Sequence, residues 1–265
     1  MPRLKKKNTF PTLRVSPVAV MTLPFLLLMA ALAVAVVFHT SRGEETALPQ
    51  ALDKELELIA IEDYLAALLI NEVPFPGEPA FKNAADSKAA MEAIVWTIHS
   101  RRAPLPTGYT RRQVAATPST NLIDILTAAN QMEGFFKTDD DRHAFAPRVK
   151  ERVDYLNLLG QRDDTPTITE LLDYAYAIAH GYVEGNALPF ADPFAGLTHL
   201  SPDDVTGSPY GWMTDDPAFH PGGNFIRIPD DFGGSLGGNR FFTLRKTPLP
   251  PPDDAKNVLD DSPAN

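Results

Sequence analysis

An uncharged, apolar stretch at residues 18–38 restricts what this chain can fold into more than any other part of the sequence. About 20 apolar residues are enough for a helix to cross the ~30 Å hydrocarbon core of a membrane, so the stretch predicts one transmembrane helix. Five Lys and Arg residues and no acidic residue precede it. The positive-inside rule therefore keeps residues 1–17 in the cytoplasm and places the rest of the chain on the other side.

A cleaved signal peptide is the alternative interpretation of this stretch. Its apolar region would be unusually long, and the small-residue site at residues 33–35 lies inside the apolar run, whereas a cleavage site follows such a run. Length and site position favour an anchor. The prediction is a single-pass protein of the cytoplasmic (inner) membrane whose C-terminal domain is extracytoplasmic, facing the periplasm.

The chain has 265 residues, which is room for one sizeable domain with appendages. We predict a basic cytoplasmic segment at 1–17, the transmembrane helix at 18–38, a linker at 39–50, a folded domain at 51–246 and a disordered tail at 247–265. The chain contains no cysteine, which excludes disulfides, thiolate catalysis and Cys-ligated zinc.

Charge is divided unevenly along the chain. Five of its 24 Lys and Arg residues precede the apolar stretch, so everything after it holds 34 acidic residues against the remaining 19 Lys and Arg. A strongly acidic domain disfavours nucleic acid as a partner, because phosphate binding needs a basic patch. An uncharged or mixed-charge polymer suits this domain better. The histidines show no HExxH or paired spacing, so we expect no metal and no cofactor.

Apolar periodicity predicts several helices after the linker. The first, at 56–70, is expected to be amphipathic, and others are expected at 86–103, 120–130, 147–160 and 167–185. Asp86 is the expected cap of the second helix, and Thr167 with Glu170 forms a capping box ahead of the last. Residues 187–238 have no helical period, and only 224–228 and 240–246 resemble short strands.

Glu72 is the first candidate catalytic residue. It follows Leu65 by seven positions and Leu68 by four, so a helix that reaches it would point its carboxyl along the core-facing stripe. Burial raises the pKa of a carboxyl, and a carboxyl that stays protonated near neutral pH can act as a general acid. The alternative is a solvated carboxylate at a helix C-terminus, which has no catalytic role.

Five segments occur in an order that points to a family: NEVPFPGE, MEAIVWTIHSRR, ILTAANQMEGFF, DPFAGLTHLSP and GGNRFF. Together they resemble the SleB-like, spore-cortex-lytic cell-wall hydrolases. The resemblance covers most of residues 62–246, and NQMEGF and DPFAGLTH are its most telling parts. No single segment is decisive, whereas five in order are much stronger.

The resemblance implies an α+β, mainly α fold: a lysozyme-like helical domain with a small β-sheet, preceded by the transmembrane helix. It also implies cleavage of peptidoglycan glycan strands between N-acetylmuramic acid and N-acetylglucosamine, as a glycosidase or a lytic transglycosylase. Glu72 would protonate the glycosidic oxygen and then act as the base, towards water or the 6-hydroxyl of the sugar. Substrate-binding positions implied by the family are Glu78, Gln131, Thr198, His199 and Asn239.

Several residues depart from the family pattern. Ser100 precedes Arg101 where an Asn-Arg pair is expected, Met132 replaces an aromatic residue, and Asn239 replaces a histidine. A longer proline-rich turn also separates Glu78 from Glu72. These departures keep a second function open, a non-catalytic peptidoglycan-binding scaffold of the cell envelope that acts within a larger assembly.

Aromatic residues in the predicted domain have two interpretations each. Trp96 lies one turn from Glu92 and from His99, and we favour a packed helix aromatic over a platform for sugar stacking. Three more aromatic residues lie among Gly and Pro residues: Tyr210, Trp212 and Phe219. They fit either a small core or the wall of a sugar-binding cleft.

Overall fold

The computed structural model describes residues 59–185, 188–197, 204–216 and 221–250. The basic segment at 1–17, the apolar stretch at 18–38, the linker at 39–50 and nearly all of the predicted tail lie outside these residues. Within the described ranges, six helices and six strands alternate with loops and one short 3-10 helix, η2 (Asp230–Phe232). The helices are α2 (Ile61–Glu72), α3 (Ala84–Arg102), α4 (Arg111–Ala115), α5 (Leu122–Leu126), α6 (Pro147–Gly160) and α7 (Pro166–Gly185). The strands are β1 (Phe135–Lys137), β2 (His143–Phe145), β3 (Val205–Thr214), β4 (Phe225–Arg227), β5 (Ser235–Leu236) and β6 (Asn239–Arg245).

The predicted fold class is wrong. Helices and sheets are mixed rather than mainly helical, because the segment after α7 forms a four-stranded sheet. The part of the chain that the structure describes also contains no helix that is both long and apolar enough to cross a membrane. Its two longest helices, α3 and α7, carry charged side chains such as Lys88, Glu92 and Glu170.

Helix α2 forms the centre of the core. Residues 64–70 are all buried, so α2 is covered on every side and the predicted amphipathic helix is wrong at this point. Helices α7, α6 and α3 pack around it. The hairpin of β1 and β2 is tied to α2 by the Tyr64 hydroxyl, which donates to the Ala144 carbonyl at 2.7 Å.

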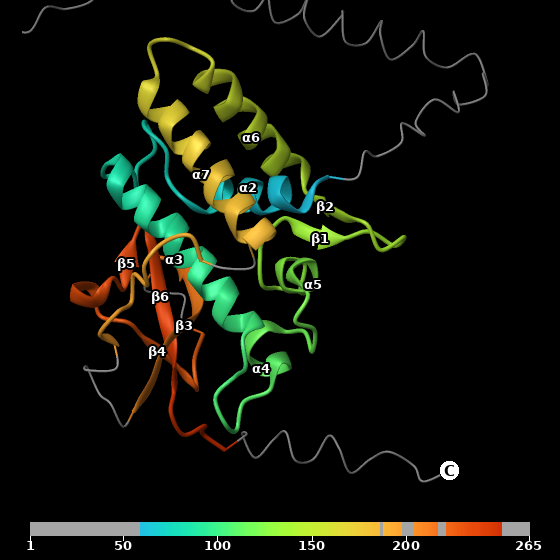
Figure 1. Ribbon diagram of the computed structural model, residues 1–265, viewed down its shortest axis with the longest axis vertical. Helices are drawn as coiled ribbons and strands as arrows, with labels where there is room; N and C mark the ends of the chain where they lie inside the picture. The colour runs from blue at the N-terminus through green and yellow to red at the C-terminus, as the bar shows by residue number, and fades with distance from the viewer. Residues whose placement is uncertain (1–58, 186–187, 198–203, 217–220, 251–265) are drawn as a thin grey trace, which may run out of the picture. The chain divides into compact units, whose positions relative to one another are not determined.

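The four-stranded sheet lies against α3. Its strand order is β3-β6-β4, with β5 also paired to β6, and every pairing is antiparallel. Figure 1 shows α3 between this sheet and α7. The same helix therefore contacts both the sheet and the other helices. Phe241 of β6 and Phe194, in the segment between α7 and β3, are buried and pack at 5.6 Å between ring centroids, which joins the sheet to the helical core.

Strand β3 is the main element that the sequence did not predict. It contains Pro209, which lacks the N–H that a ladder requires, and the register shifts on both sides of this residue. In the described sheet β3 has one pairing partner, β6. It can therefore accommodate the proline where the pairing with β6 is irregular. A proline-containing, glycine-rich segment therefore forms the longest strand of the described chain.

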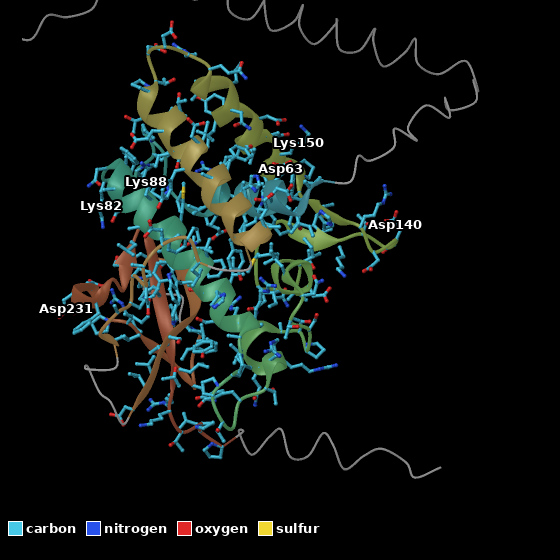
Figure 2. All side chains as sticks on the ribbon, viewed as in Figure 1. Asp63, Lys82, Lys88, Asp140, Lys150 and Asp231 are labelled. Atoms are coloured by element: carbon cyan, nitrogen blue, oxygen red, sulfur yellow. The ribbon has the colours of Figure 1, made fainter. Side chains whose placement is uncertain are left out.

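The predicted helices agree more closely with the structure than the predicted fold class does. The expected bounds of α6 are confirmed, and α3 and α7 begin or end within a few residues of their expected positions. The predicted caps are wrong: Asn83, not Asp86, caps α3 by accepting from the Asp86 amide at 2.9 Å, and α7 begins at Pro166, ahead of the proposed capping box. Figure 2 shows labelled charged residues such as Lys88 and Lys150 on the outside of the helices; Lys88 pairs there with Glu170 at 2.6 Å.

Candidate active site at the end of helix α2

Glu72 is the last residue of α2, at the point where the core helix reaches a cavity. The helix behind it is buried, and Val73 turns the chain into an extended conformation directly after it. Glu72 itself is half-buried. The helix does reach Glu72, but its carboxyl lies at the cavity rather than on a core-facing stripe, and residues 64–70 before it are all buried.

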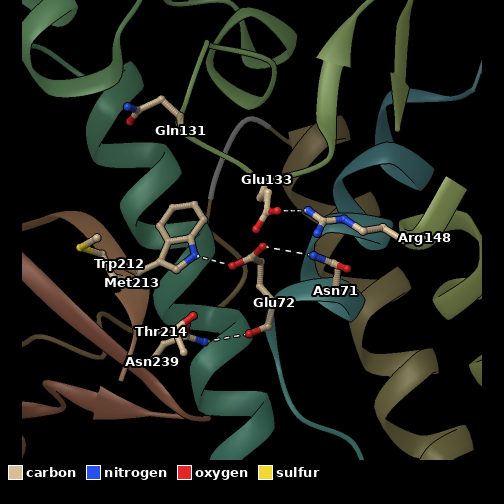
Figure 3. Close-up of a pocket in the computed structure, with 9 residues that line it drawn as sticks. All are labelled: Asn71, Glu72, Gln131, Glu133, Arg148, Trp212, Met213, Thr214 and Asn239. Atoms are coloured by element: carbon tan, nitrogen blue, oxygen red, sulfur yellow. Dashed lines mark hydrogen bonds and ion pairs between the residues drawn. The ribbon is translucent and has the colours of Figure 1, made fainter. Parts of the chain in front are cut away.

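Neutral donors surround the Glu72 carboxyl (Figure 3). The indole Nε1 of Trp212 donates to Oε2 at 3.0 Å, and the Asn71 amide Nδ2 donates to Oε1 at 3.3 Å. Burial raises the pKa of Glu72 above its usual 4.5, and these two hydrogen bonds oppose that shift only in part. The nearby charge of Glu133 raises the pKa further, while Arg152 lowers it. The net effect is that the Glu72 carboxyl holds its proton to higher pH than an exposed glutamate does.

The sheet supplies the opposite wall of the cavity. Thr214 of β3 pairs in register with Asn239 of β6, and Trp212 lies two residues before Thr214, on the same face of β3. The Asn239 amide donates to the backbone carbonyl of Glu72 at 2.8 Å. This bond ties the beginning of β6 to the end of α2, so Asn239 helps to fix the position of Glu72.

The glycine pair before Asn239 makes that contact possible. Gly237 and Gly238 join β5 to β6 in a two-residue turn, and both have positive φ, of 53° and 69°. A Cβ on Gly237 would lie 2.6 Å from the Ala90 Cβ, so the turn packs directly on α3. The GGN sequence thus brings the Asn239 side chain against α2.

Arg101 supports Trp212 from behind. Its guanidinium lies 5.2 Å from the centre of the Trp212 ring, and its Nε donates to the Tyr210 carbonyl at 2.8 Å. Arg101 is buried, and burial lowers its pKa to about 10. A cation held against the indole face is favourable and fixes the ring that donates to Glu72.

Two adjoining cavities meet at Glu72. The first has a volume of about 500 Å³, and the second, of about 480 Å³, shares Asn71, Glu72, Thr214 and Asn239 with it. Each is within the size range of pockets that take small molecules. The remaining residues that line the first cavity are Gln131, Glu133, Arg148, Trp212 and Met213. The two cavities therefore adjoin at the four residues that they share, and Glu72 is one of them.

Glu78 lies in the second cavity and is held by structural contacts. Its carboxylate forms an ion pair with Arg152, whose Nη2 donates to Glu78 Oε2 at 3.0 Å. The same oxygen accepts from the Phe75 amide at 2.9 Å. Glu78 thus fixes the proline-rich turn that follows α2.

The other predicted site residues have different outcomes. Gln131 and Asn239 line the first cavity together with Glu72. Thr198 and His199 lie outside the described residues. The substrate-binding roles of all these residues, including Glu78, stay predictions.

Sequence reasoning missed several residues of the site. It left Trp212 undecided between core and cleft wall, and the ring lines the cavity. Trp96, by contrast, packs against the core and donates to the Ala191 carbonyl at 3.2 Å. Asn71, Glu133, Arg148, Met213 and Thr214 carried no individual signal, although Glu133 lies within the NQMEGF segment. Among the residues described, no group of three or more His, Asp and Glu side chains is arranged to hold a metal ion.

Comparisons with family models, with curated proteins and with solved structures found no match for this chain.

Proposed function

We propose that this protein cleaves the glycan strands of peptidoglycan between N-acetylmuramic acid and N-acetylglucosamine, with Glu72 as the general acid. The observation that carries the proposal is the Glu72 carboxyl, half-buried, with a raised pKa, and hydrogen-bonded by the neutral donors Trp212 and Asn71. A glycosidic oxygen is a poor leaving group until it is protonated. A carboxyl whose pKa is raised keeps its proton to higher pH than usual and can supply that step.

The shape of the site supports a polymeric substrate. Two adjoining cavities, both lined by Glu72, give room for more than one sugar unit. Polar side chains line the first cavity, including Asn71, Gln131 and Thr214, and these suit the hydroxyl and N-acetyl groups of a glycan. The Trp212 ring adds an aromatic surface of the kind that contacts sugar faces.

Glu72 would act in two steps. It first gives its proton to the bridging oxygen, which leaves as a hydroxyl on one sugar. As a carboxylate, it can then accept a proton from the 6-hydroxyl of the other sugar, which closes an anhydro ring, or a water molecule adds to that sugar instead. The expected location outside the cytoplasm agrees with such a substrate and stays a prediction.

The test is incubation of the purified full-length protein with purified peptidoglycan between about pH 4 and 8, followed by mass spectrometry of the soluble products. We expect released fragments with new sugar ends. Binding to peptidoglycan without any new ends, at every pH, would reject the enzymatic function and favour the envelope scaffold.

A further inference from the structure

Glu133 places a second carboxylate at the same cavity. Figure 3 shows the Glu133 carboxylate directed towards the Glu72 carboxyl, and both residues line the cavity. The Glu133 side chain is about 84% exposed, whereas Glu72 is half-buried. One cavity therefore holds a half-buried carboxyl and an exposed carboxylate, and the two suit different steps of glycoside cleavage.

The backbone around Glu133 is fixed. Gly134, with a φ of 89°, follows it, and a Cβ there would lie 2.8 Å from the Val149 side chain. The Gly134 carbonyl accepts from the Ala146 amide at 2.7 Å, and the Phe135 amide donates to the Met132 carbonyl at 3.3 Å. The turn that bears Glu133 is thus packed against the start of α6, which holds the backbone of Glu133 beside the cavity.

Arg148 holds the Glu133 carboxylate from outside. Its Nη2 lies 2.5 Å from Glu133 Oε1, and its own side chain is about 58% exposed. Exposed ion pairs contribute about 1 kcal/mol or less, so this pair orients the carboxylate without locking it. The second oxygen of Glu133 can accept a hydrogen bond from water at the cavity.

We propose that Glu133 is the general base that activates water, so that the reaction at this site is hydrolysis. This inference rests on the proposed function. A water oxygen forms a bond to the anomeric carbon while its proton passes to Glu133, and the bond from that carbon to the bridging oxygen breaks as this oxygen takes the proton of Glu72. Glu133 then returns its proton to solvent and Glu72 regains one. Inverting glycosidases use two carboxyl groups in these roles: one protonates the leaving oxygen while the other activates a water that attacks the opposite face of the sugar.

The experiment is a product analysis in isotopically labelled water. Wild-type protein is expected to produce reducing ends that carry one labelled oxygen. Glu133→Gln should lower the rate of reducing-end formation about 10²-fold or more, with peptidoglycan binding retained, because general base catalysis contributes 10²–10⁴-fold. Glu151→Gln, an exposed change on α6, is the matched control and should retain the wild-type rate.

A chemical rescue separates catalysis from structure. Formate added to Glu133→Ala can replace the missing base and should restore part of the rate, which would not occur if Glu133 only supported the fold. The proposal is overturned if the wild type yields only anhydro ends, if Glu133→Gln keeps its rate, or if formate restores nothing. In each of these cases the wild-type protein still cleaves the glycan. If the wild type cleaves nothing, the proposed function itself is rejected.

Discussion

Two carboxylates six residues apart, Glu72 and Glu78, have opposite surroundings. Glu72 ends the core helix and meets only neutral donors, the Trp212 indole and the Asn71 amide. Glu78 lies in the following turn, where it pairs with Arg152 and accepts from the Phe75 amide. The first can hold a proton, whereas the second is fixed by a cation. The partners of a carboxyl, rather than its place in a short motif, decide whether it suits acid catalysis or structural support.

Replacing each carboxylate by its amide gives the strongest test of this difference. Glu72→Gln keeps the shape of the side chain but has no proton to deliver, so glycan cleavage should fall about 10²–10⁴-fold. Glu78→Gln should lower cleavage by less than about tenfold, because the acid remains and only the turn loosens. Initial rates of fragment release measure both. If the two effects are reversed, Glu78 is the acid and the comparison fails.

The sequence predicted part of this site for reasons that proved incomplete. It points to Glu72 from an apolar stripe, whereas residues 64–70 are buried on every side of the helix and Glu72 lies half-buried at the cavity. Helical periodicity does not report such burial when charged residues such as Glu62 and Asp63 occupy the first turn. The long-range partner Trp212 could not be identified, since its strand contains Pro209 and its contact with Glu72 spans 140 residues of sequence.

Other parts were accessible from local chemistry alone. Pro147 and Gly160 mark the bounds of α6 because proline suits a first helical position and glycine a last one. The GGN sequence resembles part of a family motif, but its structural role, a turn that ties Asn239 to the Glu72 carbonyl, depends on contacts with α2 and α3. Local signals thus predicted most helices and the strands β4 and β6, whereas β3, the pairing of the sheet and the cavities depend on distant contacts.

Arg152→Gln tests the structural side of the comparison. This change removes the ion pair with Glu78 and the bond from Arg152 Nη2 to the Val73 carbonyl at 3.0 Å. Both partners of the pair are partly exposed, so we expect a loss of about 1–3 kcal/mol, or a few degrees per kcal/mol in Tm. Lys150→Gln, which breaks the exposed pair with Asp154 on the same helix, is the control. Equal losses in both variants would mean that Arg152 is only another surface cation.

Trp212→Phe sharpens the comparison by removing one neutral donor from Glu72. The Trp212 hydrogen bond favours the ionised carboxylate and lowers the pKa of Glu72 against the larger effect of burial. Without it the pKa should rise, so the alkaline limb of the pH–rate profile should move to higher pH by up to about one unit. Arg101 and the sheet remain in place, so the fold should persist. An alkaline limb that stays in place would show that Glu72 does not control this limb.

The smallest expected effect is a pH-dependent difference in stability between Glu72→Gln and the wild type. Because burial raises the pKa of Glu72 above 4.5, the folded state binds a proton more tightly than the unfolded state. The stability gained from that proton is complete below about pH 4.5 and is lost as the pH rises through the folded pKa. The glutamine amide does not titrate, and its oxygen can still accept from Trp212. Thermal melts should therefore show similar Tm values at pH 4 and a higher Tm for Glu72→Gln at pH 8, by a few degrees if the difference is about 1 kcal/mol. The opposite result is a Tm of Glu72→Gln that falls relative to the wild-type Tm between pH 4 and pH 8. It would mean that the Glu72 carboxylate is stabilised where it lies, as Glu78 is by Arg152.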